Sequence, residues 1–156
     1  MSVVISTAGP VTLTGIVTET GMAALRIPGG TIGPNGLIEV RTLWSCTNSA
    51  NNKILSIRFS ATPGAITLQP GVQTMLTTSA SAQGLWIIAN VGATNTQIGY
   101  ANAGGVIITP YGTINAAPVS GAIDTTVDAW VNVNGIIAAA GETLTLQHCA
   151  VVIFPA

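Results

Sequence analysis

Charge is what this sequence has least of. Its 156 residues include four Lys or Arg and five Asp or Glu, a charged fraction of 6%, where an ordinary soluble domain has about 25%. The hydrophobic fraction of 48% is ordinary, so uncharged polar residues and glycine replace the missing charges. A surface with few charges repels its own copies weakly, which suits a protein covered by further copies or by a partner. The alternative that the composition leaves open is a monomer with a neutral surface rich in Thr and Asn.

Basic clusters and long apolar runs are also missing. The net charge is −1 with only four basic residues, which leaves no basic patch for a nucleic-acid backbone. The stretch 60–122 has no charged residue, but Gly, Pro and Asn interrupt it throughout, so no segment reaches the roughly 20 apolar residues of a spanning helix. The first 11 residues are apolar without a basic residue, so we expect no signal peptide. Neither nucleic acid nor a membrane is an expected partner.

Groups that perform chemistry are few. His148 is the single histidine and lies within a predicted strand, which favours a core or interface histidine over a catalytic base. Asp124 and Asp128 would lie about 13 Å apart on an extended strand, too far for a shared proton or a glycosidase pair. Cys46 and Cys149 are about 100 positions apart and are expected to be reduced, buried thiols. No catalytic, cofactor-binding or metal-binding residue is assigned, and the sequence predicts a protein that is not an enzyme.

Short β-type segments are what the sequence does contain. Runs of β-branched and apolar residues alternate with polar ones, and Gly, Pro and Asn turns separate them. The best helical candidate, 136–140, is too short to stand alone, and a strand or loop fits it equally well. Eight to ten strands are expected, drawn from residues 1–11, 11–18, 23–27, 37–47, 53–60, 65–68, 73–78, 85–89, 97–101, 106–109, 126–133 and 143–154.

This pattern predicts an all-β fold, an antiparallel jelly-roll-like β-sandwich. One domain over residues 1–156 is expected, with residues 1–10 as a possible extended N-terminal arm. In segment 37–47, alternation separates Ile38, Val40, Thr42, Trp44 and Cys46 from Leu37, Glu39, Arg41, Leu43 and Ser45. In 53–60 it places Leu55, Ile57 and Phe59 together, and in 143–154 it places Leu144, Leu146, His148, Ala150 and Val152 together. Trp44 and Trp130 are expected in the core.

Four of the nine charges lie between residues 38 and 60: Glu39, Arg41, Lys53 and Arg58. If segments 37–47 and 53–60 form a hairpin, cross-strand pairs among these charges contribute only about 0.2–1 kcal/mol each. Across a subunit boundary a mismatched charge costs more than a matched pair gains. We therefore predict that these four residues set the register of an interface. A single solvated sheet face is the alternative interpretation.

Two segments carry a resemblance to a known family. ALRIPGGTIGPNGLIEVRTLWSCTNSANNKILSIRFS, residues 24–60, and GETLTLQHCAVVIFPA, residues 141–156, resemble small β-sandwich (jelly-roll) virion proteins of tailed bacteriophages. This family includes decoration (cement) proteins of capsids and head domains of tail fibres and spikes. The resemblance covers about a third of the chain. It implies a homotrimer without a cofactor, made in the host cytoplasm and placed in the virion.

The resemblance leaves two locations open. A decoration protein would bind the major capsid protein on the outside of the shell, and the chain length favours it, since a fibre protein would also need an attachment region. A tail-fibre or spike domain would bind a host surface carbohydrate by stacking sugars on aromatic side chains: Trp44, Trp86, Trp130, Tyr100 and Tyr111. A secreted lectin-like module is a third class, weakened by the missing signal sequence. We expect a capsid decoration protein.

Overall fold

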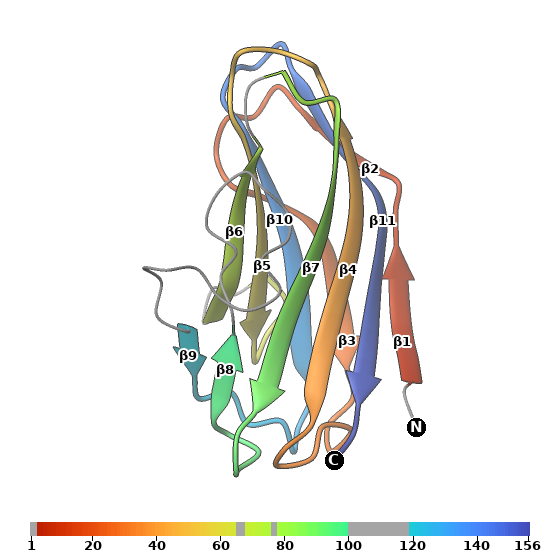
Figure 1. Cartoon of the computed structure of the whole chain (residues 1–156), viewed down its shortest axis with the longest axis vertical. Coiled ribbons are helices and arrows are strands. Elements are labelled where there is room, and N and C mark those ends of the chain that lie inside the picture. The colour runs from red at the N-terminus through yellow and green to blue at the C-terminus, as the bar shows by residue number, and fades with distance from the viewer. Residues whose placement is uncertain (1–2, 65–67, 76–77, 100–118) are drawn as a thin grey trace.

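Two antiparallel β-sheets stack face to face in the computed structural model (Figure 1). The structure describes residues 3–64, 68–75, 78–99 and 119–156, and no helix occurs among them. The all-β prediction is therefore confirmed for this part of the chain, as is the antiparallel sandwich. The strands are β1 (Val3–Ala8), β2 (Val11–Thr14), β3 (Thr20–Ile27), β4 (Leu37–Cys46), β5 (Lys53–Ser60), β6 (Leu68–Met75), β7 (Ser81–Asn90), β8 (Gln97–Gly99), β9 (Val119–Gly121), β10 (Ala129–Ile137) and β11 (Thr143–Phe154).

The larger sheet, here sheet A, has seven strands in the order β1-β11-β4-β7-β8-β9, with β2 also paired to β11. Sheet B has four strands in the order β3-β10-β5-β6. Residues 3–8 of the expected N-terminal arm form β1, which pairs with β11 of the same chain. Both termini lie at the same end of the sandwich (Figure 1).

Strand positions follow the sequence patterns closely where the patterns are long. Segments 53–60 and 143–154 coincide with β5 and β11. The segment 126–133 was placed too early: β10 runs from Ala129 to Ile137 and takes in the start of the helical candidate. The short strand β9 was not predicted, and the expected strand 106–109 lies outside the described residues.

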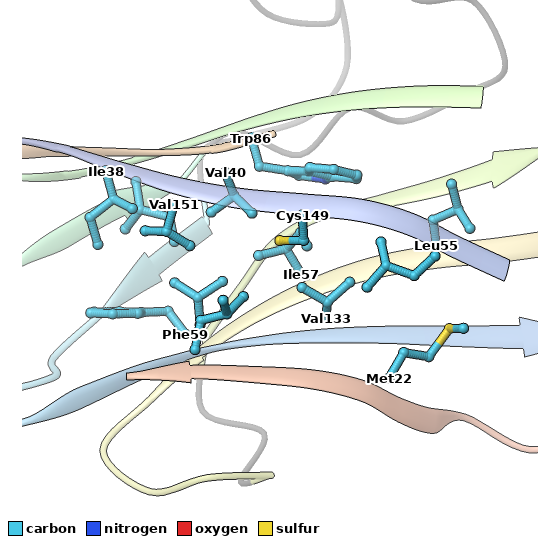
Figure 2. Close-up of a cluster of buried hydrophobic side chains, with 14 of the residues drawn as sticks. Met22, Ile38, Val40, Leu55, Ile57, Phe59, Trp86, Val133, Cys149 and Val151 are labelled. Atoms are coloured by element: carbon cyan, nitrogen blue, oxygen red, sulfur yellow. The ribbon is translucent and has the colours of Figure 1, made fainter. Parts of the chain in front are cut away.

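The core lies between the sheets and is built from alternate residues of their strands. Figure 2 shows side chains from both sheets meeting in one layer. Those labelled from sheet A are Ile38, Val40, Trp86, Cys149 and Val151, and those from sheet B are Met22, Leu55, Ile57, Phe59 and Val133. The alternation predicted for β4 and β5 is confirmed, because Val40, Trp44, Leu55, Ile57 and Phe59 are buried.

Strand β11 departs from its predicted alternation. Leu144 and Leu146 point into the core, but the next inward residues are Cys149, Val151 and Ile153. The register against β4 shifts between Leu146 and His148, which is a β-bulge that turns the following side chains over. Of the two places expected for His148, core or interface, the core is excluded, since the bulge puts its side chain on the outer surface.

The predicted hairpin between β4 and β5 is also wrong. Strand β4 pairs with β11 and β7 in sheet A, whereas β5 pairs with β10 and β6 in sheet B. Residues 47–52 cross from one sheet to the other. Both strands carry a complete apolar face, and on opposite sheets the two faces bury each other across the sandwich. In one hairpin they would lie side by side and need a third element to cover them.

Candidate functional site

The four predicted interface charges lie in three separate places. Glu39 and Arg41 lie on the outer surface of sheet A, and Arg58 lies on the outer surface of sheet B. The side chain of Lys53 is 1% exposed and lies inside the sandwich. The predicted cluster of four therefore does not form, because it depended on the hairpin.

Lys53 forms a buried ion pair with Glu142. Its Nζ lies 3.3 Å from Glu142 Oε1 and donates hydrogen bonds to Ser49 Oγ at 2.5 Å and to the Asn51 carbonyl at 2.9 Å. The hydroxyl of Ser49 also donates to Glu142. That bond lowers the pKa of Glu142, with burial acting in the opposite direction. Lys53 thus fastens two loops at one end of the sandwich and is not available to a neighbouring molecule, which corrects its assignment to an interface.

Arg58 is engaged within its own chain by Glu19. Its Nη2 lies 2.7 Å from Glu19 Oε2, and Ser56 Oγ and Asn134 Nδ2 each donate to Glu19 Oε1 at 2.9 Å. The hydrogen bond from Arg58 is the main cause that lowers the pKa of Glu19 to about 2. The residues that precede β3 are therefore held against the outer surface of sheet B.

Further polar residues on the outer surface of sheet B are also hydrogen-bonded within the chain. Asn132 and Ser60 are buried there, and Asn132 Nδ2 donates to Ser60 Oγ at 2.8 Å. The backbone N–H of Gly64 donates to Asn132 Oδ1 at 3.0 Å. Trp130, expected in the core, is half-buried on this same surface, because its neighbours Ala129 and Val131 take the inward positions of β10.

The outer surface of sheet A has the opposite character. Its three central strands present twelve side chains, which we call the A face. The strand register arranges them in four rows across β11, β4 and β7: His148-Leu43-Gln83, Ala150-Arg41-Leu85, Val152-Glu39-Ile87 and Phe154-Leu37-Ala89. Eight of the twelve are apolar, and none is buried. Leu43 and Leu85, at 51% and 55% exposure, are among the most exposed large apolar residues of the described chain.

The charged pair of the A face sits in its two middle rows. Arg41 Nη2 lies 2.6 Å from Glu39 Oε2, and Arg41 Nε donates to the same oxygen at 3.2 Å. The Arg41 side chain is 62% exposed and that of Glu39 is 19% exposed. The two charges compensate each other, so the face as a whole is neutral and mostly apolar.

A hollow of about 410 Å³ opens on the A face at its first two rows, His148-Leu43-Gln83 and Ala150-Arg41-Leu85. Its walls are Arg41, Leu43, Gln83, Leu85, His148 and Ala150, and Thr42 and Gly84 contribute to the lining. Such a hollow can receive an apolar group, with His148, Gln83 and Arg41 offering hydrogen bonds around it. Leu43 was placed correctly beside Glu39 and Arg41 by alternation. Leu85 and Gln83 were missed, because the pairing of β4 with β7 cannot be read from a sequence.

The remaining candidates for chemistry have structural roles. Asp124 accepts hydrogen bonds from Thr126 N at 2.9 Å and Thr126 Oγ1 at 2.7 Å, a turn that lowers its pKa. Asp128 accepts from Gly29 N at 3.0 Å and Arg26 Nε at 2.7 Å, which also lower its pKa. Within the described ranges, no three His, Cys, Asp or Glu side chains gather as metal ligands would.

Neither cysteine forms a disulfide. Burial raises the pKa of the Cys149 thiol to about 12. Burial also raises the pKa of Cys46, whose Sγ donates to the Ser79 carbonyl at 3.1 Å. Both thiols are therefore protonated at neutral pH, and the thiolate, not the thiol, is the nucleophile.

Aromatic side chains suited to stacking on sugars are scarce on the described surface. Trp44 and Trp86 are buried in the core, and Trp130 is half-buried. Tyr100 and Tyr111 lie outside the described residues.

No family model matches the chain, and no curated protein matches it. The described part of the chain holds no helix with the length and apolar character needed to cross a membrane.

Proposed function

We propose that this chain is a non-enzymatic structural protein of a tailed-bacteriophage virion, a decoration (cement) protein that binds the outside of the capsid and stabilises it. The observation that carries the proposal is the A face, a broad and mostly apolar sheet surface over which the described residues place nothing, on a chain that is 6% charged. Exposed apolar patches of this kind mark interaction surfaces. The proposed oligomer is a homotrimer of jelly-roll-like subunits, as the resemblance to phage virion proteins implies.

The absence of an assembled reactive site among the described residues is consistent with this role. The carboxylates of the described chain are held by turns and ion pairs, and its two thiols are protonated at neutral pH. We expect Asp124→Asn, which lies away from the A face, to leave assembly on particles unchanged, and we expect neither Asp124→Asn nor His148→Gln to abolish a catalytic activity. A hydrolase activity of the purified protein that either substitution abolishes would refute the structural role.

The test is the copy number of the chain in purified virus particles, measured by quantitative mass spectrometry against the major capsid protein. Hundreds of copies per particle are expected for a decoration protein. A few copies to a few dozen would instead support the alternative, a tail-fibre or spike domain that binds a host surface carbohydrate, for which half-exposed Trp130 and exposed Phe154 are aromatic side chains that could stack on a sugar. Absence from particles would overturn both.

A further inference from the structure

The two outer surfaces of the sandwich differ in what covers them. On sheet B, two residues outside the strands, Glu19 and Gly64, form hydrogen bonds with polar side chains of β5 and β10. Four polar residues of these strands are buried: Ser56, Ser60, Asn132 and Asn134. On sheet A, the described residues place nothing over the twelve side chains of the A face. The three central strands of sheet A are therefore mostly apolar on both surfaces, and among the described residues only their inner surface is covered, by sheet B.

We propose that the A face is the surface through which copies of this chain pack against one another. The inference rests on the self-association within the proposed function and names its surface. A strand with apolar residues on both faces is typical of a sheet covered on both sides. Around a two-fold axis the same patch serves as both halves of the contact, and around a three-fold axis neighbouring parts of one face meet.

The charges of the face favour a second copy over a different partner. Glu39 and Arg41 supply one charge of each sign, two positions apart on β4. A partner surface that carries charges of one sign would repel either Glu39 or Arg41. A second copy carries a charge of the opposite sign for each of them. Around a two-fold axis that crosses the strands over Val40, Arg41 of each copy lies opposite Glu39 of the other.

A three-fold axis parallel to the strands would arrange the charged residues Glu39 and Arg41 in layers around the axis. The three Arg41 side chains then form one layer around the axis, and the three Glu39 side chains form the next, with leucine layers from Leu43 and Leu37 above and below. In the two-fold arrangement, the hollow instead lies opposite Leu37 and Phe154 of the second copy. In both arrangements the ion pair becomes buried at the centre of an apolar contact, where a charge without its partner is costly.

The decisive variant is Arg41→Glu, with Arg26→Glu as its matched control. Both arginines are ion-paired within the chain and similarly exposed, at 62% and 60% of the side chain, but Arg26 lies on sheet B. Sedimentation equilibrium should show association of the Arg41→Glu protein weakened by about tenfold or more, since four like charges meet in the contact of two copies. The Arg26→Glu protein should associate like the wild type.

A charge swap separates the interface from a loss of folding. Glu39→Arg combined with Arg41→Glu restores one charge of each sign and should regain association. All variants should melt within a few degrees of the wild type, since exposed pairs contribute about 0–1 kcal/mol. The proposal is overturned if Arg41→Glu associates normally, or if Arg26→Glu weakens association equally.

Cross-linking then reports the arrangement. With a short bis-maleimide, Leu43→Cys alone should link copies around a three-fold axis, because the Leu43 side chains share a layer. Linkage only in the double variant Leu37→Cys/Leu43→Cys would indicate the two-fold arrangement. Either result supports the A face, and no linkage above the wild-type background in either variant would count against it.

These outcomes are separable from the virion assignment. A wild-type protein that associates through the A face but is missing from particles retains the interface and refutes the decoration role. A protein present in hundreds of copies whose association ignores Arg41→Glu retains the role and refutes the interface.

Discussion

At the scale of single residues, Lys53 shows how a charge can be structural in a protein with few charges. It occupies the first inward position of β5, ahead of Leu55 and Ile57. Its stem extends through the core while its ammonium group reaches the loop residues Ser49, Asn51 and Glu142. A buried charge is tolerated only when it is paired and hydrogen-bonded, and Lys53 meets both conditions.

We therefore expect Lys53→Met to lower the free energy of unfolding by about 3–5 kcal/mol, because it removes the cation from a buried pair. Urea unfolding at neutral pH measures the change. The double variant Lys53→Met/Glu142→Leu should be more stable than Lys53→Met alone, since it removes both charges together. Equal stability of Lys53→Met and the wild type would show that the pair is solvated.

Glu19 is the second residue whose ionisation matters for stability. Its pKa in the folded chain is about 2, against a usual value of 4.5. A carboxyl group with a depressed pKa stabilises the fold at pH values above its unfolded pKa, and this contribution is lost as the pH falls through the folded value. Ionised Glu19 thus contributes fully above about pH 4.5 and progressively less down to about pH 2.

The variant Glu19→Gln removes this contribution. The difference in unfolding free energy between wild type and Glu19→Gln should be largest near neutral pH and should shrink between pH 4.5 and pH 2. Arg58→Gln should raise the Glu19 pKa toward its usual value, because the bond from Arg58 is the main cause of the shift. Carboxyl NMR titration measures it directly, and a wild-type Glu19 that titrates near 4.5 would contradict the ion pair.

At the scale of elements, β11 shows why alternation alone misplaces residues. A strict period of two along its twelve residues predicts that His148 shares a face with Leu144 and Leu146. The bulge puts Gln147 opposite no residue of β4 and reverses the faces from there on. A one-residue shift moves every following side chain to the other surface, so one irregularity converts His148 from core to surface.

Strand β7 contains a glycine that its tryptophan requires. Gly84 and Trp86 point to the same side, and a Cβ on Gly84 would overlap the indole ring of Trp86 and lie 2.9 Å from Thr42 Oγ1. The indole occupies the volume that a side chain at position 84 would need (Figure 2 shows Trp86 in the core). Sheet A can therefore hold a tryptophan flat against its inner surface beneath the hollow of the A face.

Gly84→Ala should accordingly destabilise the fold by about 1–3 kcal/mol, the usual cost of overpacking. Displacement of the Trp86 ring should also change the tryptophan fluorescence. Gly21→Ala on β3 is the control, since its Cβ would meet only Asn134 Oδ1 at an ordinary 3.7 Å. A Gly84→Ala protein as stable as Gly21→Ala would show that the ring has room to move.

At the scale of the whole molecule, the connection between β4 and β5 decides which surfaces face outward. Because residues 47–52 cross between the sheets, Arg41 and Arg58 lie on opposite outer surfaces of the sandwich. On sheet B, polar side chains are closed over by contacts of the same chain, whereas the described residues leave the mostly apolar A face uncovered. Assembly through sheet A follows from this division of polarity.

The purified protein should therefore be an oligomer in solution. Light scattering at micromolar concentration should return a mass near three times the 15.7 kDa of one chain, because a bare A face would expose eight apolar side chains to water. A mass near twice that of one chain would retain association but refute the trimer. A mass near 15.7 kDa would refute self-association.

The sequence by itself determined the class of fold and the inward faces of β4 and β5. Alternation of β-branched and polar residues is a local property, so β4 and β5 could be assigned their buried sides residue by residue. Alternation also placed Glu39, Arg41 and Leu43 on one side of β4, which is the side that β4 contributes to the A face. The low charged fraction of 6% favoured a covered surface, although it did not indicate which surface.

Only the tertiary structure decided which strands are neighbours. A six-residue connection permits either a hairpin or a crossing between sheets, and the choice depends on how two apolar faces bury each other far along the chain. The same long-range pairing brought Leu85 and Gln83 beside Leu43, paired Lys53 with Glu142, and introduced the bulge that turned His148 outward. Each of these depends on contacts between residues distant in sequence, which local patterns do not encode.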